Sequence, residues 1–312
     1  MIIKKNKKIK PLFIGFGRQA REYAKVFKYL DIEITSVCVT DLKRNKDQID
    51  FYKIKNKYDN ISKALKEGNY NSVFVFLPWN LIDKKIIYII KNTKKIIFTE
   101  KPIALSIKKL LKINAASNKY NKKIHVLYNR RFYKIFSLIQ KKINTNKYFF
   151  HAHIPERLDH TLKNIDNKLK GKIKYHLSSH WFDFFMKITN KKITNFFKYN
   201  KTYNFILDNN KNYNKSITLK YNDLGMIKSK FIIGNNIYIL DTLEKLKIYD
   251  KKTNKLKMSI NEHKLNKFKP GVYFLIKKLI DGNFKNIPKL MVILVSSVSL
   301  FSFPFLSLSS SP

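Results

Sequence analysis

The feature that most constrains the fold is a glycine motif between an apolar stretch and an amphipathic one. Residues 11–17, PLFIGFG, are typical of a buried strand that ends in glycines, and residues 18–30 place apolar side chains on one helical face. Gly15, Gly17 and Ala20 form the spacing G-x-G-x-x-A across this junction. The first glycine permits a tight turn, the second lets a pyrophosphate approach the backbone, and the small third residue permits close packing of helix on strand. The motif predicts a dinucleotide site; a tight turn without a ligand is the alternative.

Further residues of this region fit the same site. The helix that begins with Arg18 and Gln19 supplies backbone amide donors to a phosphate. Asp41 follows a second apolar stretch, where an acidic residue binds the ribose hydroxyls, and it favours NAD because a carboxylate repels a 2′-phosphate. Lys43 and Arg44 come directly afterwards. They would hold that phosphate if the cofactor were NADP, or they are solvated loop charges.

The rest of the chain predicts two domains. Strand and helix patterns alternate up to about residue 130, which is typical of a parallel α/β sheet, and Ser106 is a candidate helix cap. From about residue 145 the chain consists mainly of strand-like runs separated by Asn, Asp or Gly turns, which is typical of antiparallel sheets. The fold class expected is therefore α/β. A Rossmann domain with a doubly wound parallel sheet (residues 1–125) precedes an α+β domain on a mostly antiparallel sheet (residues 126–290).

Residues 291–312 differ from the rest of the chain. They contain no Lys, Arg, Asp, Glu or Asn, although the chain has 64 Lys and Arg. We interpret them as a tail foreign to the fold, from a shifted reading frame or a truncated end. A membrane anchor is the alternative, because the segment approaches the ~20 residues that a membrane span needs. Several Ser residues and Pro304 interrupt it.

The charge and cysteine content bear on the partners. A formal net charge of +43 by itself suggests nucleic acid or an anionic membrane. The Lys residues are spread evenly among Asn and Ile, however, with no basic strip of interleaved aromatics, so we expect neither partner. The single cysteine, Cys38, lies in an apolar stretch and allows no disulfide. The apolar stretch among the first residues is too short for the core of a signal peptide, so a cytoplasmic protein is expected.

Four stretches in order resemble one family. TEKPIALS (99–106) resembles the Glu-Lys-Pro signature of the glucose–fructose oxidoreductase, inositol dehydrogenase and rhizopine-catabolism (Gfo/Idh/MocA) family. VFLPWNLIDKKI (75–86) is similar to the family's segment beside the nicotinamide ribose. YNRRFYKI (128–135) is similar to its segment near the domain junction, and SSHWFDFF (178–185) to its His-x-x-Asp helix start. The resemblance covers about residues 10–290.

The resemblance implies roles for individual residues. Pro78, Asn80, Glu100 and Lys101 would contact the cofactor. Lys101 would also contact the substrate, stabilise negative charge on the reacting oxygen and relay a proton. His180 would be the general base for alcohol oxidation or the acid for carbonyl reduction. Asp183, three residues on, would orient substrate hydroxyls; stabilisation of the first helical turn is the alternative.

Other candidate substrate residues have open alternatives. Many family members carry an acidic residue four positions before the catalytic histidine, but this chain has His176 there. Proton transfer is then rearranged, the substrate is anionic, or catalysis is lost. Arg130 or Arg131 would meet an anionic group such as a sugar-nucleotide phosphate, or form an interdomain ion pair. His153 shares a strand face with His151. We expect a substrate contact or a structural role there and no metal.

The function expected is an NAD(P)-dependent oxidoreductase that transfers hydride to or from a sugar, cyclitol or nucleotide-sugar hydroxyl or ketone. We expect a homo-oligomer formed through the C-terminal sheet. The alternative is a non-catalytic dinucleotide-binding regulator or partner protein of the same fold. A nucleic-acid-binding protein is supported by the charge alone.

Overall fold

The chain folds into two compact units. The computed structural model describes residues 9–163, 167, 173–191, 193–208, 215–223, 225–242, 244–262, 268–283, 287, 288 and 290, except for the side chains of 173–176, 208 and 270. The first unit contains the described residues up to Asn129 and those from Gly271 onward, and the second contains those of Arg130–Pro270. The apolar tail predicted at 291–312 lies outside the described residues.

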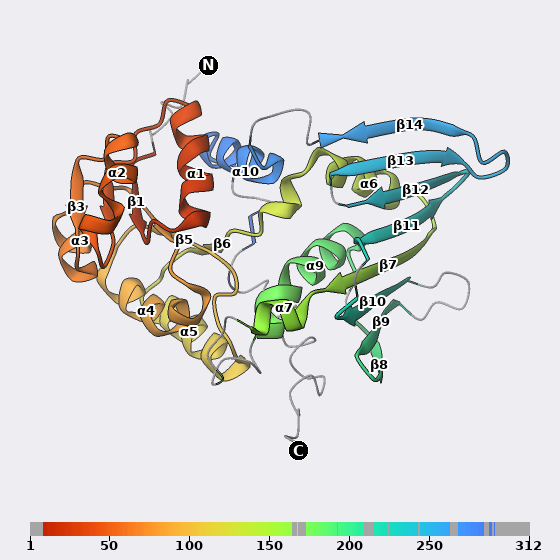
Figure 1. The fold of residues 1–312 in the computed structure, drawn as a ribbon, viewed down its shortest axis with the longest axis horizontal. Coiled ribbons are helices and arrows are strands. Elements are labelled where there is room, and N and C mark those ends of the chain that lie inside the picture. The colour runs from red at the N-terminus through yellow and green to blue at the C-terminus, as the bar shows by residue number, and fades with distance from the viewer. Residues whose placement is uncertain are drawn as a thin grey trace. The chain divides into compact units, whose positions relative to one another are not determined.

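The first unit is built on a six-stranded parallel sheet with the order β3-β2-β1-β4-β5-β6. The strands are β1 (Pro11–Ile14), β2 (Ser36–Cys38), β3 (Asn56–Tyr58), β4 (Ser72–Val75), β5 (Ile96–Thr99) and β6 (Ile124–Val126). The helices are α1 (Arg18–Tyr29), α2 (Leu42–Phe51), α3 (Ile61–Glu67), α4 (Trp79–Asn92), α5 (Ile107–Lys119) and α10 (Pro270–Ile280). Figure 1 shows α1 and α10 on one side of this sheet and α4 and α5 on the other. The strand order reverses between β1 and β4, as the predicted doubly wound fold requires.

The central strands are apolar on both faces because helices cover both faces. All four residues of β1 and all four of β4 are buried. Phe13, Phe74 and Phe98 stand in register on β1, β4 and β5, with ring centroids 5.6 and 4.8 Å apart. Cys38 is buried at the end of β2, where burial raises the pKa of its thiol to about 11. It is therefore a packing residue rather than a reactive thiolate.

Local sequence signals located some elements of this unit and missed others. The predicted Ser106 cap is confirmed, since its hydroxyl accepts a hydrogen bond from Lys109 N at 3.3 Å. The second apolar stretch, residues 32–41, forms only a short strand, because only 36–38 pair and Asp41 already caps α2. The sequence patterns did not reveal α2, β3 and α3. The edge strand β3 has the polar sequence NKY, which lacks the apolar character of a buried strand.

The second unit is built on an eight-stranded sheet with the order β14-β13-β12-β11-β7-β10-β9-β8. All neighbours are antiparallel except β7 and β10, so the predicted mostly antiparallel sheet is confirmed. The strands are β7 (Tyr148–Glu156), β8 (Asn195–Tyr199), β9 (Thr202–Asp208), β10 (Lys215–Tyr221), β11 (Lys228–Ile233), β12 (Asn236–Asp241), β13 (Lys245–Asp250) and β14 (Leu256–Asn261). The helices described are α6 (Lys134–Asn144), α7 (Leu158–Leu162) and α9 (Ile173–Thr189), after the 3₁₀ turn η1 (Asn129–Phe132).

The strand β7 shows which side chains of this sheet face the core and which face away from it. Burial alternates at every residue from Tyr148 to Glu156. Tyr148, Phe150 and Ile154 belong to the core that also contains apolar residues of α6 and α9. The intervening side chains, which include His151 and His153, are only partly buried on the other face.

The helix α9 begins earlier than the sequence suggested. We expected a helix start near residue 178, but α9 begins at Ile173. Asp183 is therefore not in the first turn, and the alternative that it stabilises the helix dipole is wrong. Polar residues between 160 and 176 hid the start, because they break the apolar periodicity.

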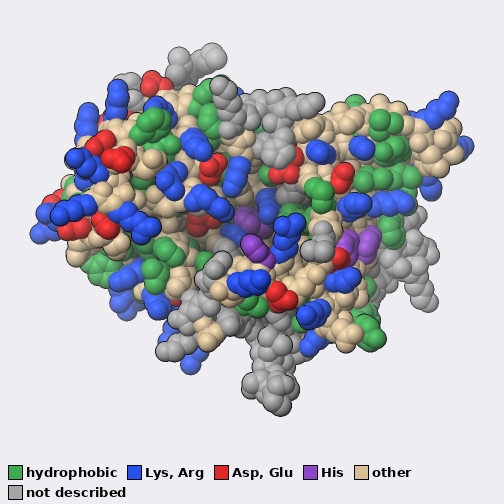
Figure 2. Space-filling view, in the orientation of Figure 1, with side chains coloured by type: hydrophobic (Ala, Val, Ile, Leu, Met, Phe, Trp, Pro, Cys, Tyr) green, Lys and Arg blue, Asp and Glu red, His purple; other side chains and the backbone are tan. Residues whose placement is uncertain are grey.

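Figure 2 shows Lys and Arg side chains dispersed over the visible face, with Asp and Glu among them. In the part of the chain that the structure describes, no helix has the length and apolar character needed to cross a membrane.

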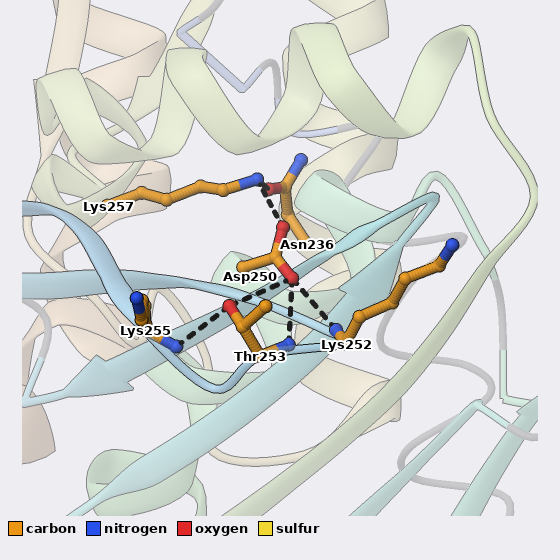
Figure 3. Close-up of polar contacts among 6 residues, drawn as sticks. All are labelled: Asn236, Asp250, Lys252, Thr253, Lys255 and Lys257. Atoms are coloured by element: carbon orange, nitrogen blue, oxygen red, sulfur yellow. Dashed lines mark hydrogen bonds and ion pairs between the residues drawn. The ribbon is translucent and has the colours of Figure 1, made fainter.

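The turn between β13 and β14 is organised by one carboxylate (Figure 3). Asp250 Oδ1 accepts hydrogen bonds from the backbone N of Lys252 and of Thr253, each at 2.9 Å, and Asp250 Oδ2 lies 2.7 Å from Lys257 Nζ. Lys257 Nζ also donates to Asn236 Oδ1 on β12 at 3.0 Å. These donors hold the pKa of Asp250 well below its usual value, and the Lys257 side chain contributes most.

We expect Asp250→Ala to lower the urea midpoint of unfolding at neutral pH. The carboxylate contributes its stability above the pKa of an unfolded Asp, and this contribution disappears as the pH falls through the depressed folded pKa. The difference between wild type and variant should therefore shrink in acid. Lys252→Ala is the matched control, because Lys252 contributes only its backbone N–H. Equal midpoints for Asp250→Ala and Lys252→Ala at neutral pH would contradict the assignment.

Candidate functional site

The turn after β1 requires glycine at position 15. Gly15 has φ +92°, and its N donates to Cys38 O at 2.8 Å. A Cβ on Gly15 would lie 2.7 Å from Phe76 O, so the turn packs directly on the segment after β4. A Cβ on Gly17, in contrast, would meet nothing within 4 Å. Gly17 is thus not required by packing, and its exposed backbone is open to a ligand.

The start of α1 fits the pyrophosphate of a dinucleotide. Gly17 occupies the N-cap position without a side-chain hydrogen bond, and the first turn contains no acidic residue. The terminal amides and the helix dipole therefore face this opening without a competing negative charge. Ala20 is fully buried, as close packing of helix and strand requires, whereas Arg18 is exposed. These residues fit the cofactor that the motif predicted.

The other predicted cofactor residues of this unit follow β2, β4 and β5, at the same edge of the parallel sheet as the glycine turn. Asp41 is exposed and caps α2, with Oδ1 accepting from Arg44 N at 2.9 Å. Lys43 and Arg44 are exposed in the first turn of α2. Pro78 is the N-cap residue of α4, and Asn80 lies in its first turn.

Glu100 and Lys101 are buried directly after β5. They are 8% and 9% exposed. Glu100 N donates to Val75 O at 3.0 Å, which continues the pairing of β4 and β5, and Lys101 N donates to Glu100 Oε2 at 3.3 Å. Burial raises the pKa of Glu100 to about 7, and the charge of Lys101 opposes that rise. A lysine and a carboxyl of raised pKa therefore lie together at the sheet edge that also holds the glycine turn.

The second unit contains a buried ion pair among the predicted site residues. Arg131 Nε donates to Asp183 Oδ2 at 2.7 Å, and Arg131 Nη2 donates to Asp183 Oδ1. Both side chains are 7% exposed. Burial raises the pKa of Asp183, and the Arg131 guanidinium opposes the rise. The fork of hydrogen bonds ties η1 to α9, so the Asp183 carboxylate already has a strong partner inside its own unit.

A second contact ties the same two segments. The Arg130 guanidinium stacks on Trp181, with its central carbon 3.5 Å from the ring centroid. Trp181 Nε1 donates to Glu156 Oε1 at 2.9 Å, at the end of β7. Burial lowers the pKa of Arg130 to about 10, against the opposing charges of Tyr133, Glu156 and other acids. Arg130 remains a cation at neutral pH.

His180 lies on α9 between these anchored residues. It is partly buried, three residues before Asp183 and next to Trp181. Ser178 lies two residues earlier on α9, and its Oγ is 3.4 Å from the Tyr221 hydroxyl of β10. The helix segment that carries His180 is therefore fixed on several sides. His176 also belongs to α9, but its side chain lies outside the described part of the chain.

The two histidines of β7 have protein partners. His153 Nε2 lies 2.9 Å from Asp223 Oδ2, and His151 Nδ1 lies 3.0 Å from Ser216 Oγ. Burial and the neighbouring His153 lower the pKa of His151. No group of three or more candidate metal ligands occurs among the described residues. The predicted substrate contact of His153 stays a prediction.

Sequence reasoning missed several residues that organise these sites. Glu156 occupies an inward position of β7, and a polar residue in a core register was the signal that could have revealed it. Glu262 is fully buried and accepts from Ile135 N at 2.6 Å, in place of a local cap on α6. Tyr133 donates its hydroxyl to Glu244 Oε1 at 2.9 Å. Tyr133 and Ile135, at the start of α6, thus have partners more than a hundred residues away in sequence. A local sequence pattern cannot predict such contacts.

Comparison with known proteins agrees with the fold and the glycine turn. Residues 9–128 match the profile of an oxidoreductase family with an NAD-binding Rossmann fold, the Gfo/Idh/MocA family. A search of curated proteins gives no significant match. The resemblance found in the sequence is confirmed for residues 9–128, which match the model of this NAD-binding oxidoreductase family, and the predicted cofactor NAD is the one that the matched fold binds.

Solved structures with a similar fold extend over nearly the whole chain. A dehydrogenase from Chromobacterium violaceum aligns with a TM-score of 0.75 at 13% identity, covering 94% of this chain and 93% of that one. The super-repressor mutant of Gal80p from Saccharomyces cerevisiae aligns at 0.78 and 12%, covering 95% of both. The WlbA dehydrogenase from Bordetella pertussis, in complex with NADH and UDP-GlcNAcA, aligns at 0.68 and 13%, also covering 95% of both. At these identities the likeness establishes the fold of both units.

The two glycines should respond differently to substitution. Gly17→Val should abolish NADH binding while the unfolding midpoint stays near that of wild type, because a side chain there blocks the ligand and its Cβ has no neighbour within 4 Å. Gly15→Ala should destabilise the fold by at least about 1 kcal/mol, since it combines a positive φ with a backbone clash. Calorimetric titration and urea unfolding measure the two effects. Unchanged NADH affinity in folded Gly17→Val would refute the placement.

The buried pair should behave as a structural element. Asp183→Asn should lower the free energy of unfolding by about 3–5 kcal/mol, because it leaves the Arg131 charge buried without its partner. The double variant Arg131→Met/Asp183→Leu should recover most of that loss, since no unpaired charge remains. Urea unfolding of Arg131→Met, Asp183→Leu and the double variant measures this coupling. Additive losses in the double variant would contradict it.

Proposed function

We propose that this protein is an NAD-dependent oxidoreductase acting on a hydroxyl or ketone of a sugar, cyclitol or nucleotide sugar. The observation that carries the proposal is the position of Lys101 directly after β5, at the sheet edge that also holds the glycine turn. Ligands of doubly wound sheets bind at this edge. When bound, NAD supplies the acceptor or donor of the hydride, and NADP is the alternative cofactor.

Two side chains are proposed to handle charge and protons in the reaction. The Lys101 ammonium stabilises negative charge that develops on the substrate oxygen. His180 accepts the hydroxyl proton during oxidation and returns it during reduction, because an imidazole titrates near neutral pH. Asp183 then acts mainly through Arg131, by fixing the segment that carries His180.

We propose that Arg130 contacts an anionic group of the substrate. Arg131 is already paired with Asp183, whereas Arg130 Nη1 is buried without a hydrogen-bond partner among the described residues. The stack on Trp181 fixes the plane of the Arg130 guanidinium. A carboxylate or phosphate would satisfy the free donor. WlbA, which has a similar fold, was solved with the nucleotide sugar UDP-GlcNAcA, and this supports an anionic sugar substrate.

A non-catalytic regulator of the same fold is the second candidate. Its support is the similarity to the super-repressor mutant of Gal80p, together with His176 at the position where many family members have an acidic residue. Both candidates use the NAD site, so dinucleotide binding alone does not separate them.

The remaining proposals concern assembly and location. We propose that the face of the second sheet opposite α6 and α9 joins copies of the chain, because Phe149 and Ile232 lie in register on that face and are not fully buried. A monomer in sedimentation velocity would contradict this.

The cytoplasm remains the expected location.

Turnover by variants tests the catalytic roles. Lys101→Met should keep NADH affinity within a few-fold and reduce turnover by about 10²–10⁴, as expected for a positioned proton-transfer group. His180→Ala should reduce turnover similarly, and the double variant should lose less than the product of the two factors. Single-turnover assays with a panel of nucleotide sugars measure this. A wild type that binds NADH and turns over none of the panel would support the regulator instead.

A further inference from the structure

Glu156 places a carboxylate where the pattern of β7 calls for an apolar side chain. It is the last residue of the strand, on the buried side that includes Phe150 and Ile154, and it is 9% exposed. A carboxylate is costly to bury unless hydrogen-bond donors satisfy its oxygens. Trp181 Nε1 supplies one such donor, 2.9 Å from Glu156 Oε1. Since an apolar residue often stabilises a buried position at least as well, the carboxylate calls for a role other than stability.

The ends of β7 and β10 together hold one face of α9. Glu156 and Tyr221 are partners in register at these ends. The carboxylate of Glu156 accepts from Trp181, and the Tyr221 hydroxyl lies 3.4 Å from Ser178 Oγ. Ser178 and Trp181 are three residues apart, so they share a face of the helix. The indole of Trp181 is therefore tied to the sheet at its edge, and a rotation of the ring would break this hydrogen bond.

The face of the same indole carries the guanidinium of Arg130. The central carbon of Arg130 lies 3.5 Å from the ring centroid, and Trp181 is 7% exposed. Arg130 Nη1 is buried without a hydrogen-bond partner among the described residues. An arginine side chain loses much rotamer freedom when it is held in one place, and a stack on a fixed ring removes that cost before a ligand binds. The direction of the Arg130 donors thus depends on Trp181, and the ring orientation depends on Glu156.

We propose that Glu156 is a positioning residue for substrate binding: by holding the ring of Trp181, it fixes the Arg130 guanidinium in the orientation that receives an anionic group of the substrate. This role rests on the proposed contact between Arg130 and a substrate anion. The group received is an oxyanion, a carboxylate or a phosphate carried by a sugar. Glu156 acts through Trp181 and does not touch the substrate.

The charge of Glu156 and its hydrogen bond affect a bound anion in opposite directions. A negative charge on Glu156 repels the anion, so removal of the charge alone strengthens binding. Loss of the hydrogen bond releases Trp181 and with it Arg130, which weakens binding. Glu156→Gln removes the charge but keeps an acceptor oxygen, whereas Glu156→Leu removes both. The two variants therefore separate positioning from electrostatics.

Calorimetric titration of the full chain, with NADH in excess, measures the effect. UDP-glucuronate carries phosphates and a carboxylate, UDP-glucose carries phosphates, and glucuronate carries a carboxylate. Arg130→Met should weaken binding of those ligands that carry the contacted anion, which identifies its source. For these ligands Glu156→Leu should lower affinity by about tenfold, as expected for one directed hydrogen bond, and Glu156→Gln should bind no more weakly than wild type. Equal losses in both Glu156 variants, or tighter binding by Glu156→Leu, would overturn the proposal.

A variant of Trp181 decides the case if Glu156→Leu fails to fold. Trp181→Phe keeps an aromatic face for Arg130 but lacks the N–H, so it should also lower affinity. The double variant Glu156→Leu/Trp181→Phe leaves no buried carboxylate without its donor, and it should lose no more affinity than either single variant. Wild-type affinity in folded Trp181→Phe, or additive losses in the double variant, would contradict the positioning role.

The chain without substrate gives an independent readout. In a Trp79→Phe background, Trp181 is the only tryptophan. Time-resolved fluorescence anisotropy should show little nanosecond motion of the ring in this parent and in Glu156→Gln, and a larger amplitude in Glu156→Leu. Asp159→Asn is the matched control, because it removes an exposed carboxylate three residues beyond Glu156. It should leave both the anisotropy and the ligand affinities unchanged.

Failure of the anion contact and failure of the positioning role give different results. If wild type bound none of the three ligands, or if Arg130→Met bound all of them as wild type does, the proposed contact of Arg130 would be wrong. The anisotropy would still decide whether Glu156 fixes the ring of Trp181. A ring that stays immobile in Glu156→Leu would overturn the positioning role even where the ligands bind.

Discussion

The close approach of the Gly15 turn to the end of β4 is the constraint on which the first unit depends. A positive φ at Gly15 and the absence of a Cβ bring the turn against Phe76 O and direct the start of α1 to the carboxyl edge of the sheet. The same edge receives the ends of β4 and β5, with Glu100 and Lys101 after β5. A parallel sheet thereby collects residues that are more than eighty positions apart in sequence at one edge.

The second unit fixes its candidate residues by a different means. Its sheet provides a core on one face, and polar contacts then anchor η1 and α9 to each other and to the end of β7. The Arg131–Asp183 pair is buried and joined by two hydrogen bonds. Arg130 stacks on Trp181, and Trp181 donates a hydrogen bond to Glu156. Such contacts add little net stability compared with an apolar core, but they permit one arrangement of the charged groups. A fixed His180 is what the proposed proton transfer requires.

The sequence revealed features that depend on local chemistry. The glycine spacing, the Ser106 cap and the shared strand face of His151 and His153 are all short-range patterns, and each was found where predicted. The early start of α9 was missed because polar residues mask its first turns. The pairing of Arg131 with Asp183 spans 52 positions, and that of Ile135 with Glu262 spans 127, so only the fold reveals them. The elements between β2 and β4 were missed because β3 is a polar edge strand.

Hydride transfer itself is the most direct test of the proposed oxidoreductase. NADH carrying deuterium at the transferable position of the nicotinamide would be incubated with the wild-type chain and a panel of keto sugars and nucleotide keto sugars, and the products examined by mass spectrometry. We predict that deuterium appears on the carbon of the reduced carbonyl, and that Lys101→Met transfers it far more slowly. Tight binding of NADH without transfer to any acceptor of the panel would contradict the enzymatic account.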